Sequence, residues 1–593
     1  MDQVISLPYR GNVIDQDDSF RLVYLEPGHG DSTIHVKLGN TRLADCPPYE
    51  ALSYTWGDAA QTATIQISDD VDGSETIAHN VTANCYSALR RLRRPNERRA
   101  LWIDAICINQ SSTAERNHQL GLMAAIYAKA SQVVVYLGDG DDESDAAMDV
   151  IANILDPPDY KQTWFSRHYK LTGVNFLTTS PDNCVAALFR RPWFSRIWVL
   201  QEIANARSAT VYCGGKELPW ESFRDFVHYN VAVKWLENIP FAVQYSARKS
   251  PRHWTVVSRR LLGMLMSTRS CGATDPRDKV FALLPLLERE KQLLRAAQAE
   301  SDPEAAVDTG VLLPDITLNY SLSPCDVFIS LAVYFLKHIG LDTLRHIGQS
   351  SPNMTSLPSW VPDWSQPLKS RYRKIHVSEY QALPDLGPTW DYNISSFHEL
   401  RVKATNCGVV KSIGGLCDID NDQFPISEWQ ELVSQESHDD SSFQKLIAGG
   451  RLIYQYVVKA VISRVSEYEL NGRDAVRDAE LEADPDIRNR PLRNVIVAFT
   501  SPSLAMQAKY VLDACDGRRL FVTDDREIGL APENVEEGDV VFSIEGASHP
   551  FVLRKVTADD EVGDNYYKLV GECYLQGVKK IAAKSSSEPI ILI

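Results

Sequence analysis

The sequence lacks the short motifs of several common enzyme classes. It has no Gly-x-x-x-x-Gly-Lys-Ser/Thr run to cradle phosphates and no Gly-x-Gly-x-x-Gly after an expected strand. It also has no Gly-x-Ser-x-Gly elbow and no His-Glu-x-x-His pair on a helix. We therefore expect neither a nucleotide-driven motor nor a metallohydrolase.

The eleven cysteines form no Cys-x-x-Cys pair and no His/Cys cluster at metal spacing. Their scatter and odd number fit a reducing compartment, so we predict no metal site. No apolar run approaches the roughly 20 residues of a membrane-spanning helix, and the N-terminal residues lack the apolar core of a signal peptide. These features predict a cytoplasmic protein without a membrane span.

Positive charge is also scarce, with 61 Lys and Arg against 78 Asp and Glu and a net charge of −17. This balance predicts no nucleic-acid partner, because such affinity depends on neutralising phosphates. One basic run, RRLRRPNERR at residues 90–99, flanks an apolar stripe and is interpreted as a solvated helix end followed by a turn. The 593 residues, 44% of them hydrophobic, can fill several cores.

Hydrophobic periodicity in the first part of the chain alternates between strand and helix. We expect strands at residues 20–25, 34–38, 51–54, 64–67, 100–104, 132–137 and 208–213. Helices are expected at residues 82–94, from a Ser112/Glu115 capping box onward, and across residues 193–207. This alternation predicts an α/β fold with a mostly parallel, flavodoxin-like sheet flanked by helices.

Three regions are expected along the chain. Residues 18–215 form the α/β domain, and residues 216–400 form a mainly helical middle region with an exposed insertion at 288–310. Residues 401–593 form a mixed region that ends in a small β-rich module at about 515–580, with strands at 519–523, 539–544, 551–556 and 566–570.

A single carboxylate, Glu202, lies in the otherwise apolar run Ile197-Trp-Val-Leu-Gln-Glu-Ile203. An ionised group on a helix buried on several sides must find partners or shift its pKa. One interpretation is a structural salt bridge to Arg196 or Arg207, and the other is a functional site. In the second case the site would lie beyond the carboxyl ends of the strands, near the loops at 55–60 and 105–111.

Three blocks of the α/β half carry a family resemblance. YEALSYTWGD at 49–58, LWIDAICINQSSTAERNHQLGLMAAIYAKASQVVVYLG at 101–138 and RPWFSRIWVLQEIANAR at 191–207 resemble the signature of the fungal heterokaryon incompatibility (HET) domain. Downstream segments, such as ATDPRDKVFALLPL at 273–286, are similar to those that accompany this domain. The resemblance implies non-self recognition followed by programmed cell death in a filamentous fungus, a form of innate immunity.

HET domains are in turn remotely similar to TIR domains, which gives the site residues candidate roles. The resemblance implies a TIR-like fold, with Glu202 as the catalytic residue for hydrolysis of the nicotinamide–ribose bond of NAD as substrate, and no resident cofactor. It implies ligand-binding roles for Trp56, Asp58, Asp104, Asn109 and Trp198. Simpler roles remain open, since Trp56 could cover the end of the sheet and Asp104 could cap the adjoining loop or helix.

The resemblance leaves two mechanisms open. In the first, the domain depletes NAD through Glu202. In the second, it is a non-catalytic module that associates with itself or with another death-signalling protein, and Glu202 serves the structure. A third alternative is recruitment of a HET-derived protein to another intracellular regulatory role.

Overall fold

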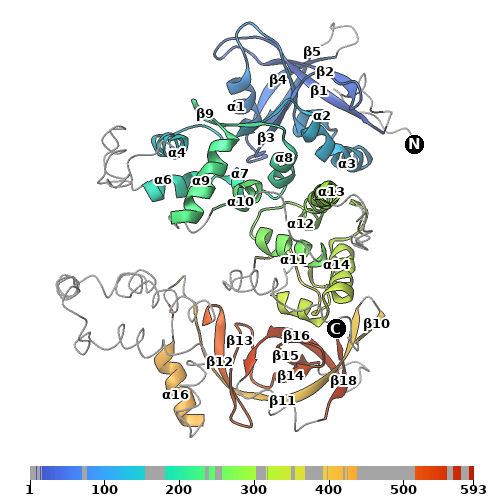
Figure 1. Ribbon diagram of the computed structural model, residues 1–593, viewed down its shortest axis with the longest axis vertical. Helices are drawn as coiled ribbons and strands as arrows, with labels where there is room; N and C mark the ends of the chain where they lie inside the picture. Colours follow the sequence, from blue (N-terminus) through green and yellow to red (C-terminus); the bar gives the residue numbers. More distant parts are fainter. Residues whose placement is uncertain are drawn as a thin grey trace, which may run out of the picture. The chain divides into compact units, whose positions relative to one another are not determined.

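The computed structural model describes two compact units, Met1–Ser323 and Pro324–Ile593 (Figure 1). The described residues are 9, 14, 17–69, 76–153, 181–233, 239–247, 257–301, 316, 318–348, 354–367, 392–396, 398–418, 421, 423, 425–436, 515–556, 565–575 and 586–593. Most of the expected strands fall within these ranges. The predicted boundaries at residues 215 and 400 stay predictions.

The first unit is built on a nine-stranded sheet of spatial order β5-β4-β2-β1-β6-β3-β7-β8-β9. Its strands are β1 Ser19–Leu25, β2 His35–Arg42, β3 Glu50–Tyr54, β4 Thr62–Asp69, β5 Thr76–Thr82, β6 Arg99–Trp102, β7 Gln132–Tyr136, β8 Ala209–Cys213 and β9 Lys216–Pro219. The sequence pattern located seven of them and missed β5 and β9. Both missed strands alternate partly exposed and exposed side chains, except at the buried Val81 of β5, so they carry little apolar signal.

The prediction of a mostly parallel sheet needs correction, because the sheet is mixed. Four strands, β6, β3, β7 and β8, form a parallel centre in which Ala51 pairs with Trp102 and Val133. Antiparallel pairings join β1 to β2 and β6, β4 to β5, and β8 to β9. The central order is second, first, third and fourth along the chain, as in flavodoxin-like folds, but unrelated families share this order.

Helices cover both faces of the parallel centre (Figure 1). The crossover to β6 contains α1 Ala83–Leu92, and the crossover from β6 to β7 contains α2 Asp104–Cys107 and α3 Thr113–Lys129. These crossovers run in opposite directions, so right-handed connections place α1 and α3 on opposite faces. The helix α8, Val199–Asn205, packs against α3. The other described helices before β8 are α4 Asp142–Ala152, α6 Pro181–Phe189 and α7 Pro192–Ser195.

The helix expected across residues 193–207 is two short helices, α7 and α8, separated at Arg196. Arg196 has an extended backbone and forms a β-bridge with Gly272. The Gly272 N–H donates to Ser195 O at 2.5 Å, and the Ile197 N–H donates to Gly272 O at 3.1 Å. A distant segment therefore takes the hydrogen bonds that a continuous helix would have used. The expected strand at 100–104 is also shorter, because α2 begins at Asp104.

The described part of the first unit after β9 is mainly helical and packs partly on α8. Its helices are α9 Trp220–Val233, α10 Phe241–Ala247, α11 Val257–Thr268, α12 Asp278–Phe281 and α13 Leu284–Ser301. The insertion expected at 288–310 begins inside α13, where Glu290 is 5% exposed and pairs with Arg260. Its first part is therefore not an exposed excursion, and residues 302–310 lie outside the described ranges.

The second unit begins with α14 Pro324–His338 and the 3-10 helix η1 Leu341–His346 and ends in a β-rich module. The long strand β11, Glu399–Leu416, pairs with β18 and β14, so β11, β14, β15, β16 and β18 form a closed ring. The other elements are β10 Tyr392–Ser396, α16 Ile426–Glu436, β12 Arg518–Thr523, β13 Ile528–Pro532, β14 Val540–Ile544, β15 Pro550–Lys555, β16 Tyr566–Glu572, β17 Tyr574–Leu575 and β18 Glu588–Leu592.

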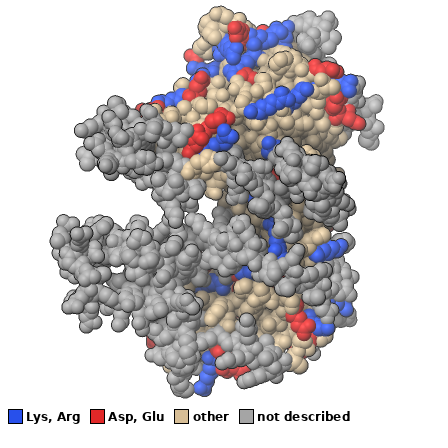
Figure 2. Space-filling view, in the orientation of Figure 1, with Lys and Arg blue, Asp and Glu red and all other residues tan. Residues whose placement is uncertain are grey.

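The arginines of the basic run at residues 90–99 bond mainly to other residues of the first unit. Arg93 donates to the carbonyl oxygens of Gly30, Ser32 and Thr33, and Arg99 pairs with Glu50. On the face shown in Figure 2, basic and acidic side chains of this unit lie next to one another. None of the described helices is both long and apolar enough to cross a membrane.

Candidate functional site

The carboxylate of Glu202 is buried at the centre of the first unit, with 3% of the residue exposed. The Ser53 hydroxyl, on β3, donates to Glu202 Oε2, and the Trp193 indole N–H donates to Ser53 Oγ at 2.7 Å. Because an indole N–H is only a donor, Ser53 accepts from it and directs its own proton to Glu202. The chain of hydrogen bonds from Trp193 through Ser53 to Glu202 thus makes the carboxylate the acceptor.

Burial raises the pKa of Glu202 to about 7, against the opposing effects of Arg196 and the Ser53 hydrogen bond. The nearby carboxylate of Asp104 raises the pKa further. Glu202 is therefore poised to change charge near neutral pH. A carboxylic acid with a pKa near neutral pH is typical of acid–base sites. Buried carboxylates with a purely structural role also have raised pKa values.

The charge of Arg196 acts on both carboxylates and lowers the pKa of each. Its guanidinium donates to the carbonyl oxygen of Tyr54, the last residue of β3. Its charge acts on both Glu202 and Asp104, yet within the described part of the chain no ion pair shorter than 4.0 Å joins it to either carboxylate. Arg196 therefore influences both carboxylates through its charge rather than through a direct ion pair. The alternative partner predicted for Glu202, Arg207, instead donates to Ala128 O at 2.9 Å.

Two further residues, Trp56 and Asp104, lie where the parallel strands β3 and β6 end. Trp56 follows β3 and is 38% exposed, and its indole N–H donates to Asp104 Oδ2 at 2.9 Å. Asp104 follows β6, accepts the Ala105 N–H at 2.7 Å, and has a pKa raised by burial. Gly57, in the loop expected at 55–60, has a φ of +77°, a conformation that favours glycine. Trp56, Asp104, Arg196, Glu202 and Ser53 together form what we term the acidic cluster.

The other three predicted ligand residues lie outside the acidic cluster. Asp58 is exposed and accepts the Ala60 N–H at 2.9 Å within its own turn. Asn109 is 8% exposed, and its side-chain oxygen accepts from the backbone N–H and hydroxyl of Ser111 at 3.2 and 2.6 Å. The Trp198 indole interacts instead with Asp278, where it lowers the pKa of that carboxyl against the dominant effect of burial.

The sequence did not indicate Ser53 or Trp193, and for Arg196 it left open a structural pair with Glu202 or a contact with an anionic ligand. Ser53 is the one polar residue at the apolar end of β3, which was a usable signal. Trp193 offered none, because its contact with Ser53 spans 140 positions in the sequence. Among the described residues no group of His, Cys, Asp and Glu could hold a metal ion. Burial raises the pKa of the Cys107 thiol to about 12, which disfavours a nucleophilic role.

Residues 49–202 match the family described as Heterokaryon incompatibility protein (HET). The chain carries a HET domain. This HET domain contains the whole acidic cluster, from Ser53 to Glu202. Residues 486–592 match a second family, described as Het-6 beta-barrel domain.

Similarity to known incompatibility proteins extends beyond the HET domain. The chain is 25% identical to "Heterokaryon incompatibility protein 6, OR allele" of Neurospora crassa, over 92% of this chain and 94% of that protein. It is 26% identical to "Vegetative incompatibility protein HET-E-1" of Podospora anserina, over 28% of this chain and 10% of that protein. No solved structure matches the chain.

Proposed function

We propose that this chain acts in heterokaryon incompatibility, and that its HET domain triggers cell death by hydrolysing NAD at the acidic cluster. The biological role is supported by the relatives of that name, one of which aligns along nearly the whole chain. The chemistry is supported by one observation in particular. Burial raises the pKa of Glu202 to about 7, and Glu202 interacts with Asp104, which accepts a hydrogen bond from the exposed Trp56 at the carboxyl ends of parallel strands.

In this proposal the ionised Glu202 stabilises positive charge that develops on the ribose. The bond between the anomeric carbon and the nicotinamide nitrogen breaks, and its electron pair leaves with neutral nicotinamide. Water then adds to the anomeric carbon and releases a proton. A fixed carboxylate in a site of low dielectric stabilises the oxocarbenium-like transition state. Arg196 would pair with a phosphate, and Trp56 would stack on a ring of the substrate.

The substrate must reach a carboxylate that is 3% exposed. Among the described residues, the Trp56 indole is held by its hydrogen bond to Asp104, and 38% of Trp56 is already exposed. In the proposal, binding displaces this indole from Asp104 and opens the way to Arg196 and Glu202. A single neutral-to-charged hydrogen bond of this kind contributes about 1.5–3 kcal/mol, which binding energy can offset.

The non-catalytic alternative is favoured by the burial of Glu202. The Ser53 hydroxyl already satisfies one carboxylate oxygen, and Arg196 compensates the charge at longer range. A group held in this way can stabilise the junction between β3 and α8 without meeting a ligand. The HET domain would then signal by assembling with itself or with another protein.

One comparison separates the two mechanisms. Purified full-length protein is concentrated with NAD, and nicotinamide release is followed for the wild type, Glu202→Gln and the control Glu50→Gln. Glu50 is also an acidic residue in the same unit, but it lies at the opposite end of β3. Release that is lost only in folded Glu202→Gln supports catalysis. Cell death in hyphae that persists with Glu202→Gln, without nicotinamide release by any variant, supports the scaffold.

A further inference from the structure

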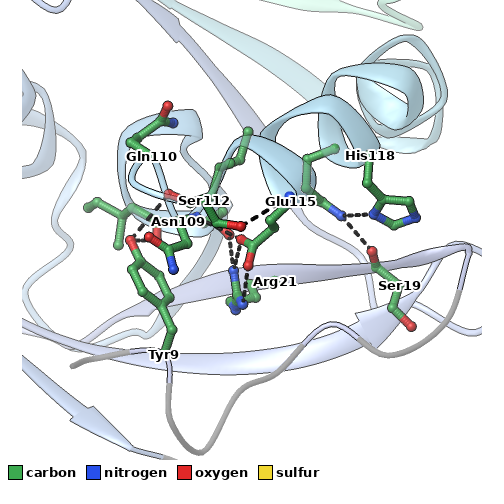
Figure 3. A network of polar contacts seen from close by, with 12 residues as sticks. Tyr9, Ser19, Arg21, Asn109, Gln110, Ser112, Glu115 and His118 are labelled. Atoms are coloured by element: carbon green, nitrogen blue, oxygen red, sulfur yellow. Dashed lines mark hydrogen bonds and ion pairs between the residues drawn. The ribbon is translucent and has the colours of Figure 1, made fainter. Parts of the chain in front are cut away.

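A second polar cluster surrounds residues 104–110, the segment that follows β6 and carries Asp104 (Figure 3). The Tyr9 hydroxyl lies 3.2 Å from both Ile106 O and Ile108 O. The Arg21 guanidinium donates to Cys107 O at 2.9 Å, and Glu115 accepts the Asn109 N–H at 2.7 Å. Two side chains from the start of the chain and one from the following helix thus bind the backbone of one short segment.

The centre of this second cluster is a buried ion pair. Arg21, on β1, is 1% exposed and meets Glu115 through two hydrogen bonds, at 2.5 and 3.1 Å. The same guanidinium lies 4.7 Å from the centre of the Tyr9 ring. Buried ion pairs contribute little net stability, because desolvation offsets their attraction. Their effect here is therefore on the conformation of the segment that they contact.

Glu115 makes these contacts at the expense of the expected capping box. The Glu115 N–H does donate to Ser112 Oγ at 3.3 Å, which is one half of that motif. The reciprocal half is replaced, because the carboxylate turns to Arg21 and to the Asn109 N–H. The side chain that would have closed the start of α3 instead ties α3 to the segment before it.

A further contact holds α3 on β1 one helical turn later. The Gln119 side chain, fully buried, donates to Ser19 O at 2.8 Å, and His118 contacts Asp17 O at 2.9 Å. Together with the ion pair between Arg21 and Glu115, the Gln119 contact holds α3 against β1 at two points. Gln110 adds a bond within the segment, donating to Asp104 O at 3.0 Å.

We propose that Tyr9, Arg21 and Glu115 are positioning residues that hold residues 104–110 in the conformation in which Asp104 binds the Trp56 indole. None of the three belongs to the acidic cluster. Their influence on it passes through the backbone that connects Asp104 to Asn109. Any effect on NAD cleavage rests on the proposed function, whereas the positioning of Trp56 and Asp104 does not.

The proposal is tested by comparing Glu115→Gln with Glu50→Gln in the full chain. Each substitution removes the charge from a largely buried carboxylate that holds an arginine through two hydrogen bonds, but Glu50 pairs with Arg99 at the amino ends of β3 and β6. Hydrogen exchange is measured on peptides that cover residues 103–111. We expect exchange there to rise by about tenfold in Glu115→Gln and to stay unchanged in Glu50→Gln.

Trp56 provides a second, spectroscopic measurement. In protein labelled with 5-fluorotryptophan, the Trp56 resonance is assigned by its loss in Trp56→Phe. We expect this resonance to move or broaden in Glu115→Gln and to remain in place in Glu50→Gln. A change of equal size in both variants would reflect general destabilisation and would overturn the proposal.

Tyr9→Phe keeps the test decisive if Glu115→Gln does not fold. This substitution removes only the hydroxyl that contacts Ile106 O and Ile108 O. We expect a rise of about threefold in exchange at residues 103–111, consistent with loss of a typical hydrogen bond. Exchange identical to the wild type in every folded variant would overturn the proposal. A wild type that cleaves no NAD, combined with the expected exchange, would contradict the proposed function alone.

Discussion

At the scale of single residues, the chemistry of this protein centres on how Glu202 is held. Trp193 orients Ser53, Ser53 donates to Glu202, and Arg196 compensates its charge without a direct ion pair. The carboxylate is thereby kept in place while its ionisation remains costly. A fixed carboxylate whose pKa lies near neutral pH is compatible with both NAD cleavage and a non-catalytic structural role.

The raised pKa of Glu202 predicts a pH-dependent penalty on stability. Below a pH of about 4.5 the group is protonated in both the folded and unfolded states, and above about 7 it is ionised in both. Between these values the folded state loses stability as pH rises, because the unfolded chain ionises first. Removing the charge with Glu202→Gln should therefore stabilise the first unit, relative to the wild type, by up to about 3 kcal/mol above neutral pH.

Scanning calorimetry of both proteins between about pH 4.5 and about pH 8 checks this prediction. The difference in midpoint between the variant and the wild type should grow with pH across this window and then level off. A difference that is constant with pH would mean that Glu202 ionises normally and that its burial carries no penalty.

At the scale of elements, the sequence predicted those parts of the fold whose signal is local. The apolar strands β1, β3, β6 and β7 and the helix α1 were found because burial repeats at fixed spacing within each. The break between α7 and α8 was not, since it depends on Gly272, far away in sequence. The sequence named Trp56, Asp104 and Glu202 as candidate site residues, but it could not indicate the hydrogen bonds of Ser53 and Trp193, because these join residues far apart in the chain.

The second unit offers a test of close packing between its strands. A methyl group on Gly529, in β13, would meet both the Phe521 ring and the backbone oxygen of Tyr574. The ring can turn, but the backbone oxygen belongs to the paired strand β17 and cannot move without breaking that pairing. Gly529→Ala should therefore destabilise the β-rich module by about 2 kcal/mol or more, by overpacking.

Urea unfolding followed by near-ultraviolet circular dichroism measures this effect. Gly263→Ala, on α11 with open space around the added carbon, is the matched control and should be neutral or slightly stabilising. Equal stability of Gly529→Ala and the wild type would show that β13 and β17 are not packed as closely as described.

At the scale of the whole molecule, the HET match ends at Glu202 but the compact unit continues to Ser323. Gln201 donates to Ala282 O at 3.0 Å, and Trp198 reaches Asp278. Every residue of α8 from Val199 to Ala204 is buried. The helix that carries Glu202 thus depends on a segment about 80 residues further along the chain.

Truncation tests this dependence. A fragment that ends at residue 215 would uncover the apolar side of α8 and leave its polar contacts unpaired, so we expect it to aggregate or to lack fixed tertiary structure. A fragment of residues 1–323 should be soluble and show a cooperative unfolding transition in near-ultraviolet circular dichroism. Cooperative folding of the shorter fragment would show that the downstream helices do not support the Glu202 site.

The most direct test of the central claim is the pH dependence of nicotinamide release from NAD by the full-length protein. If ionised Glu202 stabilises the transition state, the rate should rise tenfold per pH unit below the pKa of about 7 and reach a plateau above it. The Glu202→Gln protein should release no nicotinamide, whereas Glu50→Gln should retain the wild-type profile. Release by Glu202→Gln at the wild-type rate, or no release by the wild type at any pH, would contradict the account.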